Sequence, residues 1–89
     1  MKIITSNQFN KDLKLIKKRG YKLNDLNIII EYLKHGISLP EKNKNHLLIG
    51  NYKNFYECHI RPDWLLIYTF DFEGNVYLLR TGTHADLFD

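Results

Sequence analysis

Apolar residues follow two different spacings along the chain, and the change near residue 46 divides it into a helical part and a strand-rich part. In residues 7–35 the spacing is three and four, which is typical of amphipathic helices. The first predicted helix follows the N-cap candidate Ser6 and ends at Gly20, and the second runs from about Asn24 to His35 and ends at Gly36. Their buried stripes are expected to be Phe9, Leu13 and Ile16 in the first helix and Leu26, Ile29, Ile30 and Leu33 in the second.

From residue 46 onward the spacing becomes two, which indicates strands. The alternation over residues 55–61 predicts one face with Phe55, Glu57, His59 and Arg61 and another with Tyr56, Cys58 and Ile60. Pro62 ends this strand, residues 64–70 and 76–81 form two more around a turn, and residues 2–5 form a short first strand. The order β-α-α-β-β-β predicts an α+β domain, with both helices packed on one face of a mainly antiparallel, twisted sheet.

Size and composition restrict the class of protein. With 89 residues, 44% of them hydrophobic and 26% charged, residues 1–89 are expected to form one globular domain. A single cysteine, Cys58, excludes a disulfide framework and favours a reducing compartment. The longest apolar run, residues 64–68, is too short to span a membrane, and the first residues contain no apolar stretch of signal-peptide length. A cytoplasmic location without membrane contact is expected.

Positive charge is concentrated in the first half of the chain. Residues 1–45 contain ten Lys or Arg against four Asp or Glu, whereas residues 46–89 contain three against six. The outer face of the first predicted helix carries Lys11, Lys14, Lys17, Lys18 and Arg19. This face suggests a polyanion or an acidic protein as partner, and the alternative is an ordinary solvated helix surface.

Groups suited to metal-free RNA cleavage gather in the second half of the chain. His46, His59 and His84 can give and take protons near neutral pH, and Asp63 can act as a base or orient a histidine. Arg80 has the planar fork that matches phosphate oxygens. Such a set can take a proton from a 2′-hydroxyl, protonate the leaving 5′-oxygen and stabilise charge on the phosphate between them.

Each of these residues also fits a structural role when taken singly. Three histidines and a carboxylate can bind zinc, but their spacing fits no compact metal motif, so no metal and no other cofactor is expected. Cys58 lies on the apolar face of its predicted strand, which favours a buried thiol over a nucleophile. Trp64 fits a core position as well as a base-stacking one.

Several motifs occur in order over residues 46–88. They are His46-Leu47-Leu48-Ile49-Gly50-Asn51, Glu57-Cys58-His59-Ile60, Pro62-Asp63-Trp64-Leu65-Leu66-Ile67-Tyr68, Leu79-Arg80-Thr81-Gly82-Thr83-His84 and Asp86-Leu87-Phe88. With these motifs the chain resembles the YafQ branch of the RelE/ParE toxin superfamily. Upstream, the likeness is weaker and consists of the two helices and the pattern Phe9-x-x-Asp12-Leu13. Asp89 is a departure, because members often stop at the phenylalanine that corresponds to Phe88.

The resemblance implies a RelE-like toxin of a type II toxin–antitoxin pair. Such toxins enter the ribosomal A site, cut mRNA there without a metal, and are held inactive by a cognate antitoxin. The residues tied to cleavage in this branch fall on His46, His59, Asp63, Arg80, His84 and Phe88.

The resemblance also suggests a division of roles among these residues. His84 is expected as general acid and His46 as general base, and Asp63 and His59 position or share the proton. Arg80 holds the scissile phosphate. Phe88 and Trp64 are expected to stack on bases, and the basic helix to contact ribosomal RNA or an acidic antitoxin segment.

Two alternatives stay open on the same fold. One is a ParE-like toxin that binds DNA gyrase, and the other is a catalytically inactive module that binds an antitoxin. Neither needs the histidines. The nuclease hypothesis predicts that His46, His59, Asp63, Arg80 and His84 converge on one face of the sheet.

Overall fold

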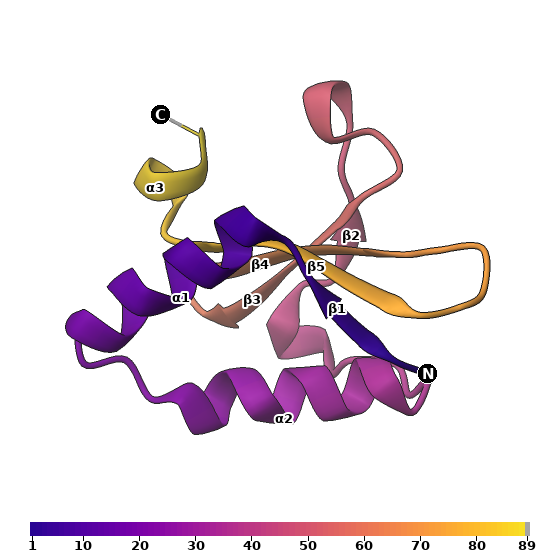
Figure 1. Ribbon diagram of the computed structural model, residues 1–89, viewed down its shortest axis with the longest axis horizontal. Helices are drawn as coiled ribbons and strands as arrows, with labels where there is room; N and C mark the ends of the chain where they lie inside the picture. Colours follow the sequence, from indigo (N-terminus) through magenta and orange to yellow (C-terminus); the bar gives the residue numbers. More distant parts are fainter. Residues whose placement is uncertain (89) are drawn as a thin grey trace.

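The computed structural model describes residues 1–88, apart from the side chain of Asn51, so Asp89 lies outside the described residues (Figure 1). The strands are β1 (Ile3–Thr5), β2 (His46–Leu47), β3 (Tyr56–Arg61), β4 (Trp64–Phe70) and β5 (Val76–Gly82). The helices are α1 (Asn7–Lys18), α2 (Leu23–Lys34) and α3 (His84–Phe88), and two short 3₁₀ turns are η1 (Glu41–Asn43) and η2 (Gly50–Tyr52). None of the helices within residues 1–88 is long and apolar enough to cross a membrane.

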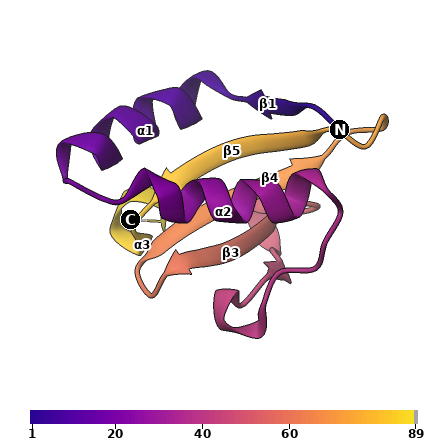
Figure 2. The same ribbon diagram turned by 90° about the horizontal axis from the view of Figure 1, so that it is seen from below.

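The five strands form one sheet in the order β1-β5-β4-β3-β2. Neighbours are antiparallel except β1 and β5, which run parallel with Ile3 opposite Val76. Helices α1 and α2 lie on one side of the sheet, and α3 and η2 lie on the other (Figures 1 and 2). The predicted α+β class and the predicted packing of both long helices on one face are therefore confirmed.

The main core lies between the sheet and the two long helices. It contains the predicted helix residues Phe9, Ile16, Leu26, Ile29 and Leu33. The strands contribute Cys58, Ile60, Trp64, Leu66, Tyr68, Val76 and Leu78. Helix α1 begins at the predicted cap, where the hydroxyl of Ser6 accepts a hydrogen bond from the backbone nitrogen of Phe9 at 2.9 Å.

A second, smaller core covers the opposite face of the sheet, where α3 packs. Its buried residues are Leu65, Ile67 and Leu87, with Leu48, Tyr52, Phe55 and Leu79 packed against them. The spacing of apolar residues does not predict α3. Its first turn is closed by a capping box, in which Asp86 Oδ2 accepts from Thr83 N at 2.9 Å and Thr83 Oγ1 accepts from Asp86 N at 3.1 Å.

Two register shifts determine which face the nearby arginines occupy. In the pairing of β4 with β5, Tyr68 is opposite Leu78 and Ile67 is opposite Arg80, so Leu79 is an extra residue in β5. This bulge turns Arg80 toward the face that carries α3. In β3, a register shift between His59 and Arg61 turns Arg61 away from that face. Arg61 consequently binds Asp25 of α2 at 2.8 Å and lies on the helix side, so the predicted common face for Arg61 and His59 is wrong.

Candidate active site

Three side chains on neighbouring strands form the first part of the site. Glu57 of β3 is opposite His46 of β2, and its Oε1 atom lies 3.4 Å from Nε2 of His46 and 3.7 Å from Nε2 of His59. The Glu57 side chain is only 6% exposed, whereas the His46 side chain is 49% exposed. A buried carboxylate therefore lies between two imidazoles at the edge of the sheet, and sequence analysis had not included Glu57 among the site residues.

Backbone carbonyls fix the other nitrogen of both imidazoles. Nδ1 of His46 lies 2.7 Å from the carbonyl oxygen of Lys44, and Nδ1 of His59 lies 3.2 Å from that of Pro62. A carbonyl oxygen only accepts, so Nδ1 carries the proton in each ring. When either ring is neutral, its Nε2 atom is left with a lone pair.

His84 and Asp63 extend the group across the end of the sheet. The ring centres of His59 and His84 are 6.0 Å apart. Asp63 lies in the turn between β3 and β4, and its Oδ1 atom accepts from the backbone nitrogen of His84 at 3.1 Å and from ring Nδ1 at 3.2 Å. These two hydrogen bonds, together with the charge of His84, hold the pKa of the Asp63 carboxyl below its ordinary value. The His84 side chain is exposed, so its Nε2 atom is accessible for proton exchange with a substrate.

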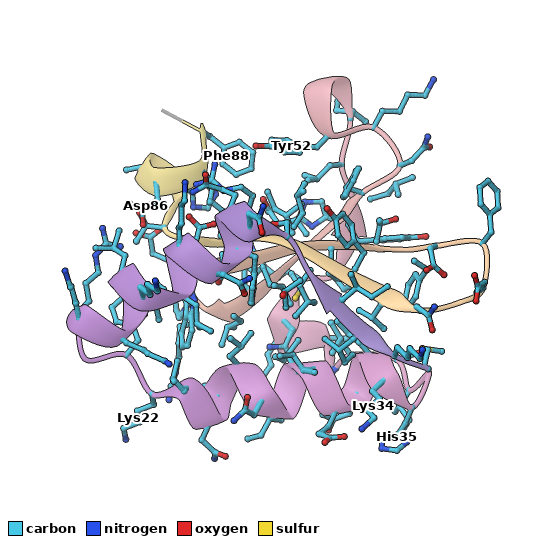
Figure 3. The ribbon with its side chains drawn as sticks, in the orientation of Figure 1. Lys22, Lys34, His35, Tyr52, Asp86 and Phe88 are labelled. Atoms are coloured by element: carbon cyan, nitrogen blue, oxygen red, sulfur yellow. The ribbon has the colours of Figure 1, made fainter. Side chains whose placement is uncertain are left out.

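Two aromatic rings continue the surface from His84. Phe88 of α3 lies with its ring centre 6.0 Å from that of His84 and 5.9 Å from that of Tyr52 in η2, which it meets edge to face. Figure 3 shows the rings of Phe88 and Tyr52 pointing toward each other above the sheet, from α3 and η2. Phe88 is 44% exposed, so its ring is accessible to a base.

Arg80 supplies the positive charge of this face. Its Nε and Nη2 atoms donate to the two carboxylate oxygens of Asp12 at 2.9 and 3.1 Å. The hydrogen bond to Asp12 is the main cause of the raised pKa of Arg80, and Tyr52 acts in the same direction. Arg80 is thus connected through Tyr52 and Phe88 to His84, and from there to His59, Glu57 and His46.

The structure brings together the residues predicted for cleavage and separates others from them. His46, His59, Asp63, Arg80, His84 and Phe88 form one connected group on the face that carries α3. Trp64 does not belong to it, because its ring is 2% exposed, packs 5.1 Å from Tyr21 and donates to Thr81 Oγ1 at 2.9 Å. The prediction that Trp64 stacks on RNA is wrong.

The basic residues of the first helix differ among themselves. Lys11, Lys14, Lys17 and Lys18 are exposed along α1. Arg19, at its end, donates to both carboxylate oxygens of Asp86 in α3, at 2.6 and 3.0 Å. Its guanidinium is therefore engaged in joining two helices, and the RNA contact predicted for it stays a prediction, as does that of the lysines.

Cys58 takes no part in the site. Its thiol is fully buried on the helix side of β3, and burial, with the nearby charge of Glu57, raises its pKa to about 12. A thiolate is the reactive form, so this cysteine is an inert core residue, as predicted.

Comparison with known proteins places the chain among the bacterial toxins of type II toxin–antitoxin systems. Residues 1–89 match the family described as "Bacterial toxin of type II toxin-antitoxin system, YafQ", and the chain belongs to this family. The mRNA interferase toxin YafQ of Escherichia coli (strain K12) is 39% identical over 84 residues, which cover 93% of this chain and 90% of that protein.

Solved structures of relatives have the same fold. The E. coli DinJ-YafQ toxin-antitoxin complex contains a chain that is 39% identical, with a TM-score of 0.88 over 98% of this chain and 96% of that one. A metal-bound toxin from Helicobacter pylori is also 39% identical, with a TM-score of 0.92 over 99% of both chains.

Proposed function

We propose that the protein is an endoribonuclease toxin that cleaves mRNA in the ribosomal A site by attack of a 2′-hydroxyl on the adjacent phosphate. One observation carries this proposal: three histidines, two carboxylates and an arginine are joined by successive contacts on one face of a small sheet. These are the groups that such a reaction needs. The curated name of the E. coli relative, mRNA interferase toxin, supports the same activity.

His84 is well suited to be the general acid. The carboxylate of Asp63 binds its Nδ1–H and stabilises the imidazolium form, while Nε2 faces away from this hydrogen bond and can protonate the leaving 5′-oxygen. This role is the one that sequence analysis assigned.

The hydrogen bonds favour His59 over His46 as the general base. His59 has its Nδ1–H bound by a carbonyl, and its Nε2 lies 3.7 Å from Glu57, too far for a hydrogen bond, so a lone pair is free to accept a proton. His46 lies nearer to Glu57, at 3.4 Å, and is proposed to hold that carboxylate in place. The sequence-based expectation had been that His46 is the base.

Arg80 and Phe88 are proposed to bind the substrate. The guanidinium of Arg80 would contact the scissile phosphate, and the exposed ring of Phe88 would stack on a neighbouring base. The lysines of α1 would contact ribosomal RNA phosphates, and a cognate antitoxin is proposed as partner because the E. coli relative is found in a complex with DinJ.

We further propose that cleavage needs no metal. A toxin from H. pylori is metal-bound, but within residues 1–88 no three His, Cys, Asp or Glu side chains are placed to hold a metal ion together. In this proposal the histidines and Arg80 supply the proton transfer and the charge stabilisation.

The test is mRNA cleavage in reconstituted translating ribosomes with EDTA present. The wild-type protein should cut in the A site, and His84→Ala should lose nearly all activity. His35→Ala is the matched control, because His35 caps the end of α2, across the sheet from Phe88, and lies 3.2 Å from Glu31 (Figure 3). This control should cut like the wild type. Absence of cleavage by the wild type would contradict the proposal, and DNA supercoiling by gyrase would then test the ParE-like alternative.

A further inference from the structure

Asp12 is a buried carboxylate on α1, and it contacts Arg80 of the site although α1 lies on the other side of the sheet from α3. Asp12 belongs to the pattern Phe9-x-x-Asp12-Leu13, in which Phe9 is a core residue. Although it is charged, Asp12 is only 8% exposed. Buried carboxylates are costly unless they are paired and hydrogen-bonded, so the surroundings of Asp12 show what retains it there.

Asp12 occupies the edge of β5 at the point where the neighbouring strand ends. Strand β1 pairs with β5 only as far as Thr5 opposite Leu78, because the chain then turns into α1. The next free amide along this edge is satisfied by Asp12, whose Oδ2 accepts from Thr81 N at 3.1 Å. Gln8 Nε2 donates to Oδ1 at 3.1 Å as well. The carboxylate is therefore held in place by groups other than Arg80.

The fixed carboxylate binds only one edge of the Arg80 guanidinium. Nε and one hydrogen of Nη2 point to Asp12. A guanidinium has five N–H donors, so the two bonds to Asp12 leave the two hydrogens of Nη1 and the second one of Nη2 on the side where Tyr52 acts on Arg80. The edge between Nη1 and Nη2 presents two parallel donors, which match two phosphate oxygens.

We propose that Asp12 is a positioning residue, which fixes the guanidinium of Arg80 so that its outer edge meets the scissile phosphate. This inference rests on the proposed function. A long arginine side chain loses rotamer freedom when it binds a phosphate, and Asp12 removes that freedom before the substrate arrives. The position of the clamp at the transition state, more than the affinity for RNA, depends on this hydrogen-bonded pair.

Asp12→Asn tests the proposal, because asparagine keeps the shape and one acceptor oxygen but cannot bind both Nε and Nη2. In the ribosomal cleavage assay, kcat should fall about tenfold to a hundredfold while KM changes little. The kcat of Asp12→Ala should fall further than that of Asp12→Asn. Asp25→Asn is the matched control, since it breaks an Asp–Arg pair of similar length, to Arg61, outside the site. That variant should keep the wild-type kcat.

A double variant separates positioning from general stability. If Asp12 acts through Arg80, Asp12→Asn should cost nothing further in an Arg80→Ala background, with folding checked by circular dichroism. Additive losses, or an unchanged kcat for folded Asp12→Asn, would overturn the proposal while leaving the nuclease function intact. Absence of cleavage by the wild-type protein would instead contradict the proposed nuclease function.

A second substitution tests the same geometry without altering Asp12. Arg80→Lys retains a positive charge beside the buried carboxylate, so the fold is kept. A lysine presents one nitrogen, which can bind Asp12 or a phosphate but not both in the arginine geometry. Its kcat should be as low as that of Arg80→Ala. Near wild-type cleavage by Arg80→Lys would show that the two-edged geometry is not required, and would overturn the proposal even if the Asp12 variants fail to fold.

Discussion

Asp63 binds His84 twice through one oxygen atom, at 3.1 Å from the backbone nitrogen and at 3.2 Å from ring Nδ1. The first bond fixes the start of α3 and the second fixes the ring on that helix. A single carboxylate on the turn between β3 and β4 therefore sets both the place and the orientation of the proposed general acid.

Asp63→Asn should reduce cleavage about a hundredfold or more, because a neutral amide stabilises the imidazolium of His84 far less than a carboxylate does. The measurement is kcat for ribosome-bound mRNA. Glu73→Gln, at the exposed turn between β4 and β5, is the control and should leave kcat unchanged. Wild-type kcat in Asp63→Asn would remove His84 from its assigned role.

Glu57→Gln should lose activity without losing stability. The carboxylate is buried, yet its distances of 3.4 and 3.7 Å to the two histidines are long for hydrogen bonds, so it contributes little to the fold. Cleavage should fall at least about tenfold, as for other supporting groups of a site, while the melting temperature does not fall. A large loss of thermal stability with retained cleavage would assign Glu57 a structural role instead.

Gly82→Ala should disturb α3. Gly82 has a φ of +156°, and a β-carbon there would lie 2.9 Å from Cβ and Oδ2 of Asp86, in the capping box that begins α3. Both the melting temperature and kcat should decrease. Gly74→Ala is the matched control, since φ is +80° but nothing lies within 4 Å of the added carbon. It should cost about 1 kcal/mol of stability, which is the strain of a left-handed residue, and leave kcat unchanged.

The pair between Arg19 and Asp86 should make stability depend on acid pH. The hydrogen bonds from Arg19 and from the Thr83 backbone hold the pKa of Asp86 well below its ordinary value of 3.8. A depressed folded-state pKa stabilises the fold above the unfolded value, and this stabilisation is lost as pH falls through the folded-state pKa. Asp86→Asn should therefore melt at a lower temperature than the wild type at pH 7, and the difference should narrow below pH 3.8. A difference that is constant from pH 7 to acid would contradict this linkage.

Much of the fold could be predicted because it depends on local patterns. The stripes around Phe9 and Ile29 and the alternation over residues 55–61 are strong enough to indicate helices and strands by themselves. Helix α3 has five residues, too few for a period to be visible, and only its Thr83-x-x-Asp86 capping box gives a signal. The face of Arg61 was predicted wrongly because a bulge is invisible in a regular alternation.

The site was predictable where residue type alone suggests chemistry, as for His46 and His84. Glu57 was missed because a glutamate on the polar face of a strand looks like an ordinary solvated residue, and only the pairing of β2 with β3 buries it between two rings. Trp64 was misplaced for the opposite reason. An aromatic residue next to Asp63 fits base stacking by its type, but its position on β4 turns it toward α1 and α2.

The parallel pairing of β1 with β5 also has a kinetic consequence. Ile3 meets Val76, Asp12 meets Arg80 and Arg19 meets Asp86, and each of these contacts closes a loop of most of the chain. Closing such long loops costs chain entropy before the native contacts form, and this tends to slow folding. The short turn between β3 and β4 places His59 and Asp63 close together, whereas the contacts of Arg80 with Asp12 and of Asp86 with Arg19 need the N-terminal helix in place. A chain in which α1 has not docked therefore lacks the contact that positions Arg80 and the contact that joins α1 to α3.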